Sequence, residues 1–574
     1  MAQPVYKQML DMKTSLPRKK RGWGRSAGVV GAVLLVALLG GAAAVGLPAA
    51  TRAQTASDAL QFSQRASAVG NARVLGRGGT GRAGIAGTSA LYYNPAGLGW
   101  MEASAATGAL AIIGTGDEAR YQVGTRDPTQ QSESVSDFGG HLALAYEFPT
   151  QRGSLVFAGA YHQVSTFGRT FSFAGRNSSN SVTDTFLPES GEYFIGEDGR
   201  PAFPPEEASS LLPFVAYEAG AVGFYPGDEY PFRQAVVPET TVEQRGTVTR
   251  DGRTQELNLG AGVEAAPGVM LGGSANVSFG RYRYENEYVE EDVLNENRPG
   301  DFSIPLEGGT LRGFDRLTYN ERFESNLVGL NLRGGVSAKA RPGVRVGTTV
   351  ETPTFYYVDE EFTQAEITMV FDEGFGGDNT RSYGNLPEDE GVGESKYRVR
   401  TPWRLGAGAQ ISLLPLTGGV VDLTLSADVE FLDWSQLDLD SDAVDLDGPN
   451  SPDVFADENF QSVVNTNLGA ELRVGGAALR AGFASRPDPI EGEFELDSGE
   501  TTDASRVAYS LGAGYRFVEN VRVNVAWLTA RYAQQYRPYA SPDSVPGESE
   551  GITAPYVDQD ITRNRFLVGV RYAF

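Results

Sequence analysis

The sequence predicts an all-β protein: a transmembrane antiparallel β-barrel of about 14 strands with an N-terminal hatch (plug) segment in its lumen. Three observations lead to this fold class. Apolar and polar residues alternate with a period of two through much of the 574-residue chain. Short connections alternate with long ones between the predicted strands. A glycine-rich segment near the N-terminus has neither a helical nor an alternating period, so it needs outside support.

Residues 1–53 have the features of a signal peptide. Basic residues precede an apolar run over 27–47, and residues 51–53 resemble a cleavage site with small flanking residues. A retained membrane anchor is the alternative, since the run is just long enough to span a bilayer. Met12 opens a more usual signal than the first residue does. We expect removal, which takes away eight cations and one anion and moves the net charge from −25 to −32.

The hatch is predicted over 54–100. Its glycine-rich part, Leu75–Trp100, contains the triplet Asn94-Pro95-Ala96. Asn satisfies backbone groups in turns, Pro fixes φ, and Ala leaves room for close packing. The triplet therefore predicts a rigid elbow between the hatch and the first strand, with a moving hinge as the alternative.

The barrel is predicted over 101–574. In the stretch 420–433, apolar residues occupy the odd positions and polar residues occupy most even positions, as in a strand with one face in water. The predicted strands approach the length of about 9–11 residues that a tilted membrane strand needs. They lie near 102–113, 138–148, 153–172, 254–265, 268–284, 323–338, 343–371, 395–413, 418–434, 461–473, 476–488, 505–517, 519–534 and 563–574.

The connections between these strands fit an outer-membrane barrel. Tight links such as 149–152 alternate with long, largely acidic ones such as 173–253 and 285–322. Such barrels have short periplasmic turns and long external loops, so both chain ends are expected on the periplasmic side. The last strand ends in Phe574 and resembles the signal that the barrel-assembly machinery recognises. We expect that machinery and outer-membrane lipid as partners, and a monomer.

Composition disfavours several other classes. The chain has no cysteine, and no hydrolase, metalloprotease or nucleotide-binding motif is present, so neither an enzyme nor a cofactor is expected. Strong acidity disfavours nucleic-acid binding. The two histidines, His141 and His162, are expected to face the lumen on adjacent strands, as polar lining rather than a metal site. The carboxylates between Asp438 and Asp447 lack the EF-hand pattern; a solvated loop is expected, with weak Ca²⁺ or Mg²⁺ binding as the alternative.

The chain resembles the FadL-type outer-membrane transporters of long-chain fatty acids and aromatic hydrocarbons. The resemblance covers essentially 54–574. It rests on the glycine-rich leader with Asn94-Pro95-Ala96, on Thr401-Pro402-Trp403 opening a strand, on 427–434 and on 479–487. It implies loop capture of an apolar ligand, a pocket in the barrel wall, and release beside a kinked third strand after the hatch shifts. Gly168 is the expected kink, and uptake is expected to be passive.

The sequence departs from this family in its external loops. The third and fourth loops, to which capture is usually attributed, are acidic and polar here. We therefore expect capture at the second loop; packing of this loop onto itself over the barrel mouth is the alternative. The ligand-binding candidates are Leu211, Leu212, Phe214, Val215 and Tyr217 in the loop, with Arg404 and Arg516 in the lumen for a ligand carboxylate.

These observations favour an outer-membrane channel for passive uptake of hydrophobic small molecules, with long-chain fatty acids as the first candidate. Two other classes stay open at this point. One is a non-transporting interaction protein, because relatives in this family act as shuttles in type IX secretion. The other is a general porin for polar solutes. A continuous apolar pocket, a closed lumen with a protein-binding loop crown, or an open aqueous channel would separate the three.

Overall fold

The computed structural model describes most of the chain after the predicted signal peptide, which lies outside the described residues. The described residues are 56–123, 130–189, 192–196, 199–203, 211–228, 230–306, 309–375, 378–384, 394–413, 421–441, 452–491, 494–495, 501–502, 504–540 and 552–574. The chain divides into two compact units, Met1–Gly46 and Leu47–Phe574, and every described residue belongs to the second. None of the described helices is long and apolar enough to cross a membrane.

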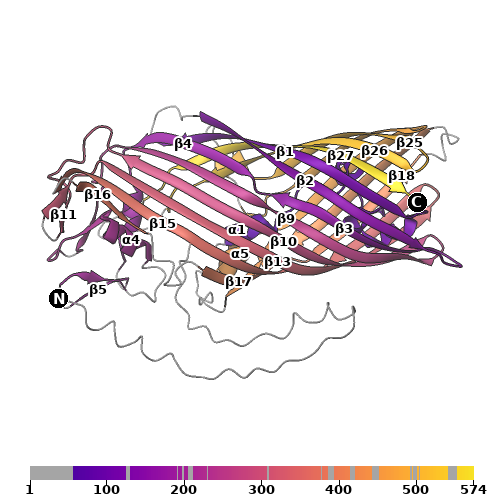
Figure 1. Cartoon of the computed structure of the whole chain (residues 1–574), viewed down its shortest axis with the longest axis horizontal. Helices are drawn as coiled ribbons and strands as arrows, with labels where there is room; N and C mark the ends of the chain where they lie inside the picture. Colours follow the sequence, from indigo (N-terminus) through magenta and orange to yellow (C-terminus); the bar gives the residue numbers. More distant parts are fainter. Residues whose placement is uncertain are drawn as a thin grey trace, which may run out of the picture. The chain divides into compact units, whose positions relative to one another are not determined.

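A closed antiparallel sheet forms the wall of the second unit (Figure 1). It closes by pairing of β1 with β27, from Ala105↔Ala573 to Gln122↔Tyr556. The described strands form a 14-strand barrel, which confirms the predicted fold class. In order around the barrel, the positions are β1 (Ala105–Gln122), β2 (Gln130–Phe148), β3 (Leu155–Thr166) with β4 (Arg169–Asn177), β9 (Val242–Ala266), β10 (Val269–Glu291), β13 (Arg316–Arg341), β14 (Val344–Glu351) with β15 (Phe355–Phe375), β17 (Glu394–Arg400) with β18 (Arg404–Ser412), β19 (Val421–Asp433) with β20 (Asp438–Ser441), β21 (Ser462–Val474), β22 (Ala477–Arg486), β25 (Arg506–Val518), β26 (Val521–Tyr536) and β27 (Tyr556–Ala573).

Shorter elements lie in the connections at the end of the barrel opposite the C-terminus, which we call the loop end; the other is the turn end. Figure 1 shows α4, β11 and β16 at the loop end and the C-terminus at the turn end. The short elements are η2 (Val182–Phe186), β5 (Phe194–Ile195), β6 (Pro201–Ala202), α4 (Leu211–Ala219), β7 (Val222–Phe224), β8 (Phe232–Gln234), β11 (Ser303–Leu306), β12 (Gly309–Arg312), β16 (Asp378–Tyr383), η6 (Trp434–Gln436), α5 (Pro452–Asn459), β23 (Phe494–Glu495) and β24 (Thr501–Thr502).

Several strands extend further toward the loop end than predicted. The fifth strand was expected over 268–284 and the sixth over 323–338, whereas β10 and β13 pair continuously from Val269↔Ala338 to Glu291↔Arg316. The extensions are rich in charged residues, which from sequence alone favour a loop. They form strands because most of the charges occupy the outer face, the buried Glu290 is hydrogen-bonded to Ser181 and Val182, and the backbone pairs continuously in the ladder.

The two faces of β10 exchange character along its length. Toward the turn end, Leu271 points outward and is 42% exposed, while Ser274 and Asn276 point inward and are buried. Toward the loop end, Arg281 points outward and Tyr282 is fully buried inside. The first half therefore has the apolar exterior of a membrane barrel, and the second half has the exterior of a soluble one.

Exposed apolar side chains form a band around the turn-end half of the barrel. We call these residues the apolar band: Leu110, Ile112, Phe138, Leu142, Leu144, Phe157, Leu259, Leu271, Leu330, Leu332, Leu405, Leu425, Leu468, Leu479, Leu511, Trp527, Phe566, Val568 and Val570. Such a contiguous apolar surface is stable next to lipid rather than water.

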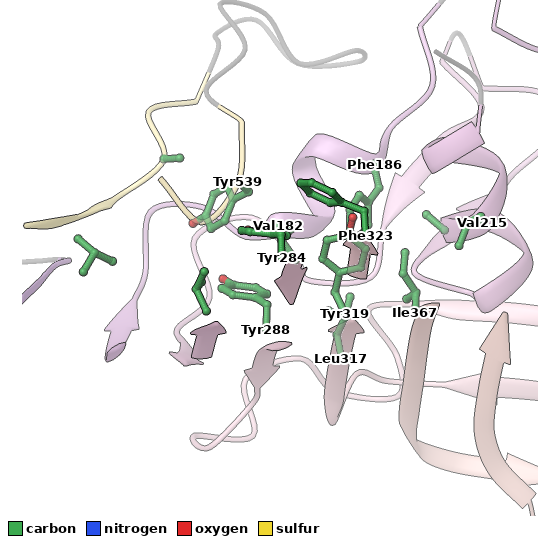
Figure 2. Close-up of a cluster of buried hydrophobic side chains, with 14 of the residues drawn as sticks. Val182, Phe186, Val215, Tyr284, Tyr288, Leu317, Tyr319, Phe323, Ile367 and Tyr539 are labelled. Carbon is green, nitrogen blue, oxygen red and sulfur yellow. The ribbon is translucent and has the colours of Figure 1, made fainter. Parts of the chain in front are cut away.

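A large apolar cluster fills the loop end of the lumen. Aromatic side chains from the extended strands, including Tyr284, Tyr288 and Tyr319, pack there against η2 and α4 of the second loop. Figure 2 shows Phe186 of η2 and Val215 of α4 next to side chains of β10, β13 and β15. The second loop thus packs over the mouth of the barrel.

Residues 56–100, which we call the N-terminal segment, lie inside the barrel. The segment contains α1 (Ala56–Ser63), α2 (Ala72–Leu75), α3 (Ala90–Tyr93) and η1 (Pro95–Trp100). Its fixed points include Asp428 of β19, whose carboxylate accepts hydrogen bonds from the backbone N–H groups of Gly81 (2.6 Å) and Arg82 (2.8 Å). About half of its residues lie outside these helices, and the wall supplies part of the partners that their backbone needs.

Candidate functional site

A cavity of about 560 Å³ lies between the N-terminal segment and the barrel wall. Both apolar and charged side chains line it. The apolar part includes Leu60, Phe167, Trp434, Val463, Ile490 and Tyr536. The charged part has ten arginines, Arg65, Arg82, Arg169, Arg250, Arg333, Arg404, Arg486, Arg506, Arg537 and Arg563, and four carboxylates, Glu351, Glu430, Asp488 and Glu491. Among the described lining residues, cations therefore exceed anions.

One side of the cavity holds paired charges. Arg65 of the N-terminal segment contacts the Glu351 carboxylate with an Nη2–Oε1 distance of 2.5 Å, and Arg333 binds the same carboxylate at 2.8 Å. Arg404, one of the predicted residues, lies 3.5 Å from Glu430, which also pairs with Arg82. Burial by itself lowers the pKa of Arg65, but the negative charge of Glu351 holds that pKa well above its ordinary value. These residues form a neutralised, rigid network.

Three other arginines of the cavity donate hydrogen bonds only to neutral oxygens, and Arg506 also lies over the Tyr532 ring, 4.6 Å from its centroid. Arg486 donates to the Ser67 carbonyl at 2.8 Å, Arg506 to the Gln64 side-chain oxygen at 2.6 Å, and Arg563 to the Thr166 carbonyl at 3.0 Å. No carboxylate of the described residues lies within 4.0 Å of any of them. The three arginines are half-buried and lack an anionic partner among the described residues, so this part of the cavity is suited to an anionic group.

The barrel wall beside this cavity is interrupted. The ladder between β2 and β3 runs from Phe148↔Leu155 to His141↔His162 and stops there. Above it, β3 ends at Thr166, and β4 begins at Arg169 and pairs with β9. Over the described residues 130–140 of β2, no backbone pairing to β3 or β4 occurs. The break between the two pieces falls at Phe167 and Gly168, where the sequence suggested a kink.

Side-chain contacts border part of this gap, one on its turn-end side and one on its loop-end side. At the turn-end side, the imidazoles of His141 and His162 are both buried, with 3.1 Å between their Nδ1 atoms. At the loop-end side, Asp137 accepts hydrogen bonds from Thr166 (2.5 Å) and Arg253 (3.1 Å). Residues 138–140 of β2 separate these two contacts. At the ordinary rise of a strand they span about 10 Å, and we call this opening between β2 and β3 the window.

Gln163 fills the window from β3. Its side chain occupies the space where a Cβ on Gly139 of β2 would stand, and it is only 3% exposed. Neither its amide nitrogen nor its amide oxygen has a hydrogen-bond partner. A buried amide without partners is unfavourable, so the closed window is held by packing and not by polar contacts.

A second, smaller cavity of about 40 Å³ lies behind the window. Ala66 and Ser67 line both cavities, as do five residues of the wall, so this strip of the N-terminal segment lies where the two cavities adjoin. The strip is held to the edge of β3 by a hydrogen bond from Ala66 N–H to the Val164 carbonyl, 3.0 Å long. The order from the lumen outward is therefore main cavity, strip, small cavity and window.

The predicted triplet Asn94-Pro95-Ala96 lies away from both cavities. The Asn94 amide donates to the carbonyls of Arg82 (2.7 Å) and Val336 (3.0 Å), and its oxygen accepts from Ala96 N–H (3.1 Å). Pro95 and Ala96 lie so close to Gly272 of β10 that a side chain there would collide with them. The triplet joins the segment to the wall as an elbow does.

The other predicted residues are dispersed. Leu212, Val215 and Tyr217 pack into or against the loop-end cluster, and Phe214 contacts Phe203 and Tyr383. The Leu211 side chain lies outside the described residues. Arg516 is exposed at the turn end, so it lies far along β25 from Arg506. Of the predicted ligand-binding residues, only Arg404 lines the main cavity.

The acidic stretch in the ninth barrel position shows ordinary ion pairs where it is described. Asp438 pairs with Arg400 at 2.5 Å and Asp440 with Arg398 at 3.2 Å. Asp442, Asp445 and Asp447 lie outside the described residues. Among those described, no group of three or more potential metal ligands occurs.

Sequence reasoning missed most of the cavity arginines. Arg486, Arg506 and Arg563 stand at the loop-end parts of three different strands. Each follows the lumen-facing alternation, which is a signal that the sequence does contain. Their meeting around one segment depends on strand register, which the sequence did not supply.

Solved structures with a similar fold exist, although no family model and no curated protein matches the chain. A FadL homologue of Pseudomonas aeruginosa is 13% identical and aligns over 89% of this chain and 100% of its own, with a TM-score of 0.50. The toluene transporters TodX of Pseudomonas putida and TbuX of Ralstonia pickettii are 12% and 13% identical, cover 88% of this chain and 98% and 99% of their own, and give TM-scores of 0.46 and 0.43. The FadL-type fold implied by the sequence resemblance is confirmed, and its closed barrel with an outward apolar band is that of an outer-membrane protein.

Proposed function

We propose that this protein is a passive outer-membrane channel for hydrophobic small molecules that carry an acidic head group, with long-chain fatty acids as the leading candidate. The observation that carries the proposal is the main cavity: it is half apolar, it has three arginines without carboxylate partners, and it lies next to a gap in the wall. An acyl chain would pack against the apolar lining, and a carboxylate would form ion pairs with the arginines.

The proposed route starts at the loop end, which faces the cell exterior. The second loop covers the mouth, so entry requires this cover to move; we propose that α4 acts as the cover and its apolar side chains as the first contact for the ligand. The N-terminal segment then acts as a hatch, because the strip Ala66–Ser67 stands between the main cavity and the window. Release occurs laterally through the window between β2 and β3. No step uses an energy source or a catalytic group.

Aromatic hydrocarbons without a charged group are less suited to this cavity. Their entry would leave Arg486, Arg506 and Arg563 buried next to an apolar molecule, which is unfavourable for a guanidinium group. TodX and TbuX are toluene transporters, and that ligand is theirs. For this chain the arginines favour an acid.

A general porin is also less well supported. The described part of the lumen is occupied by the N-terminal segment at the turn-end half and by the apolar cluster at the loop end. A porin needs a water-filled path through both. A secretion shuttle has no specific observation in its favour.

Uptake of a labelled fatty acid tests the proposal. Cells that lack their own outer-membrane route for long-chain fatty acids would express this protein or an empty vector, and uptake of hexadecanoic acid would be measured. Native mass spectrometry of the detergent-purified protein would show whether an acyl chain co-purifies. Expression without any gain in uptake, together with a ligand-free protein, would contradict the proposal.

A further inference from the structure

Positively charged side chains line the small cavity behind the window, and the proposed channel function does not account for all of them. Arg506, Arg563 and Arg565 line it together with Gln163. Arg565 is 6% exposed; within the described part of the chain it donates one hydrogen bond, from Nη1 to the Ala68 carbonyl at 3.1 Å, and its Nε and Nη2 find no partner there. Arg506 Nε is also without a partner. Three guanidinium groups thus surround a space of about 40 Å³.

The carboxylates nearest to this cavity are engaged elsewhere. Asp117 pairs with Arg169, and Asp488 accepts hydrogen bonds from the backbone N–H groups of Ala504 (2.9 Å) and Ile490 (3.1 Å). No described carboxylate lies within 4.0 Å of Arg506, Arg563 or Arg565. The remaining lining includes Ile113, Leu528 and Ala530, which cannot balance charge. A pocket with orphaned guanidinium nitrogens and apolar walls is complementary to a small anionic group joined to an apolar tail.

The small cavity lies close to the loop-end limit of the apolar band. Ile112, Phe138 and Phe566 form one row across β2, β1 and β27, because Ile112 is in register with both of the others. All three are exposed members of the apolar band, at the loop-end limit of that band on their strands. Arg565 is in register with Ile113, one residue beyond the row. The arginines therefore lie at the outer edge of the apolar band, where the hydrocarbon region of a membrane ends.

We propose that Arg506, Arg563, Arg565 and Gln163 form an exit site that holds the carboxylate of the ligand while its tail passes through the window into the membrane. The inference rests on the proposed function. A carboxylate dragged into hydrocarbon would cost several kcal/mol, whereas one held at the membrane edge stays paired throughout. The site thus lets an amphipathic acid leave tail first. Gln163 must swing away from Gly139 to open the window, and its unpaired amide can then hydrogen-bond the head group.

The matched ligands hexadecanoic acid and its methyl ester test the exit site, because they share a tail and differ in charge. Uptake of both would be compared for the wild type, for Arg565→Gln and for Arg563→Gln/Arg565→Gln. Arg571→Gln serves as the control, since Arg571 is also on β27 and on the lumen face but lies at the turn end and outside the small cavity. The heat-dependent migration of each barrel on gels would report folding.

Arg565 lines the small cavity and not the main one, so Arg565→Gln is the deciding variant. It is expected to lower uptake of the acid about tenfold, the scale of losing a charge-assisted hydrogen bond, while uptake of the ester stays near the wild-type value. The double variant should lower uptake of the acid further, because Arg563 lines both cavities. Arg571→Gln should leave both unchanged. An equal loss for acid and ester, or no loss for either, in folded variants would overturn the exit site while the channel function stands. Failure of the wild type to take up the acid would overturn the proposed function and the exit site with it.

Discussion

At the scale of single residues, Glu471 fixes the turn-end part of the N-terminal segment. This fully buried carboxylate of β21 binds Arg73 of the segment at 3.0 Å, Arg480 of β22 at 2.6 Å, and its strand neighbour Arg473. Nearby, burial and the charge of Arg73 lower the pKa of Arg77 to about 10. One anion therefore binds three cations at the point where the segment meets the wall, and the positive charge there exceeds the charge of Glu471.

Removal of that anion should be strongly destabilising. In Glu471→Ala, Arg73 and Arg480 stay buried without their partner, and the expected loss in the free energy of unfolding is about 3–5 kcal/mol. Urea unfolding of the detergent-purified protein, followed by tryptophan fluorescence, would measure it. Glu285→Ala breaks an exposed pair with Arg322 and is the control, with an expected loss below about 1 kcal/mol. Similar losses for the two variants would show that Glu471 does not have this role.

Asn94 is the second residue whose contacts make a specific prediction. Asn94→Ala removes two hydrogen bonds to carbonyl groups and one from Ala96 N–H, so the elbow should loosen while the barrel stays folded. We expect faster hydrogen exchange over 82–100 and reduced uptake of fatty acid. Asn94→Asp keeps the acceptor for Ala96 but directs a buried carboxylate at the two carbonyl oxygens, so its effect should be at least as large as that of Asn94→Ala. Normal uptake in a protein with fast exchange would mean that the triplet is only a scaffold.

At the scale of elements, the interruption between β3 and β4 makes a lateral opening of the wall possible. Above His162 the chain leaves the ladder with β2, and β4 turns inward so that Arg169 pairs with the buried Asp117 of β1. The gap is therefore held by side chains alone. Its opening breaks no backbone ladder, so it needs less free energy than separation of paired strands.

A covalent link across the gap tests whether it opens. The chain has no cysteine, so Asp137→Cys/Thr166→Cys would introduce the only pair, at a point where the two side chains already touch. Oxidation should abolish most lateral release, and a reductant should restore it. Ala145→Cys/Ala158→Cys links the same strands at a paired position and should have no effect. Full uptake by the oxidised Asp137–Thr166 variant would exclude this window as the exit.

The sequence predicted the elements better than it predicted the site, and particular residues show why. Strand number follows from local signals, such as the alternation over 420–433 and the tight links between strands, so the count is correct. The extension of β10 beyond residue 284 was missed because Glu285 and Glu287 lie on its outer face while Tyr288 faces inward, the reverse of the membrane pattern. The exit arginines were missed because Arg506 and Arg565 come together only through the register of β25, β26 and β27.

At the scale of the whole molecule, the lumen of the barrel is blocked at two levels. The apolar cluster at the loop end is closed by the second loop, and the N-terminal segment fills the turn-end half. The only interruption of the wall found among the described strands is the window between them. A molecule built in this way can pass an amphipathic ligand sideways without providing a continuous aqueous path.

Electrical conductance separates this arrangement from a porin. In planar lipid bilayers, the wild-type protein should show no steady ion current, because neither obstruction contains an open path. Deletion of residues 56–100 removes one obstruction, and further deletion of α4 with its flanks removes the packing that supports the other, so current should rise stepwise over the two variants. The heat-dependent gel migration of each variant would confirm that the barrel still forms. A large steady current through the wild-type protein would contradict the lateral route, because an open axial channel would let polar solutes through and leave the window without a function.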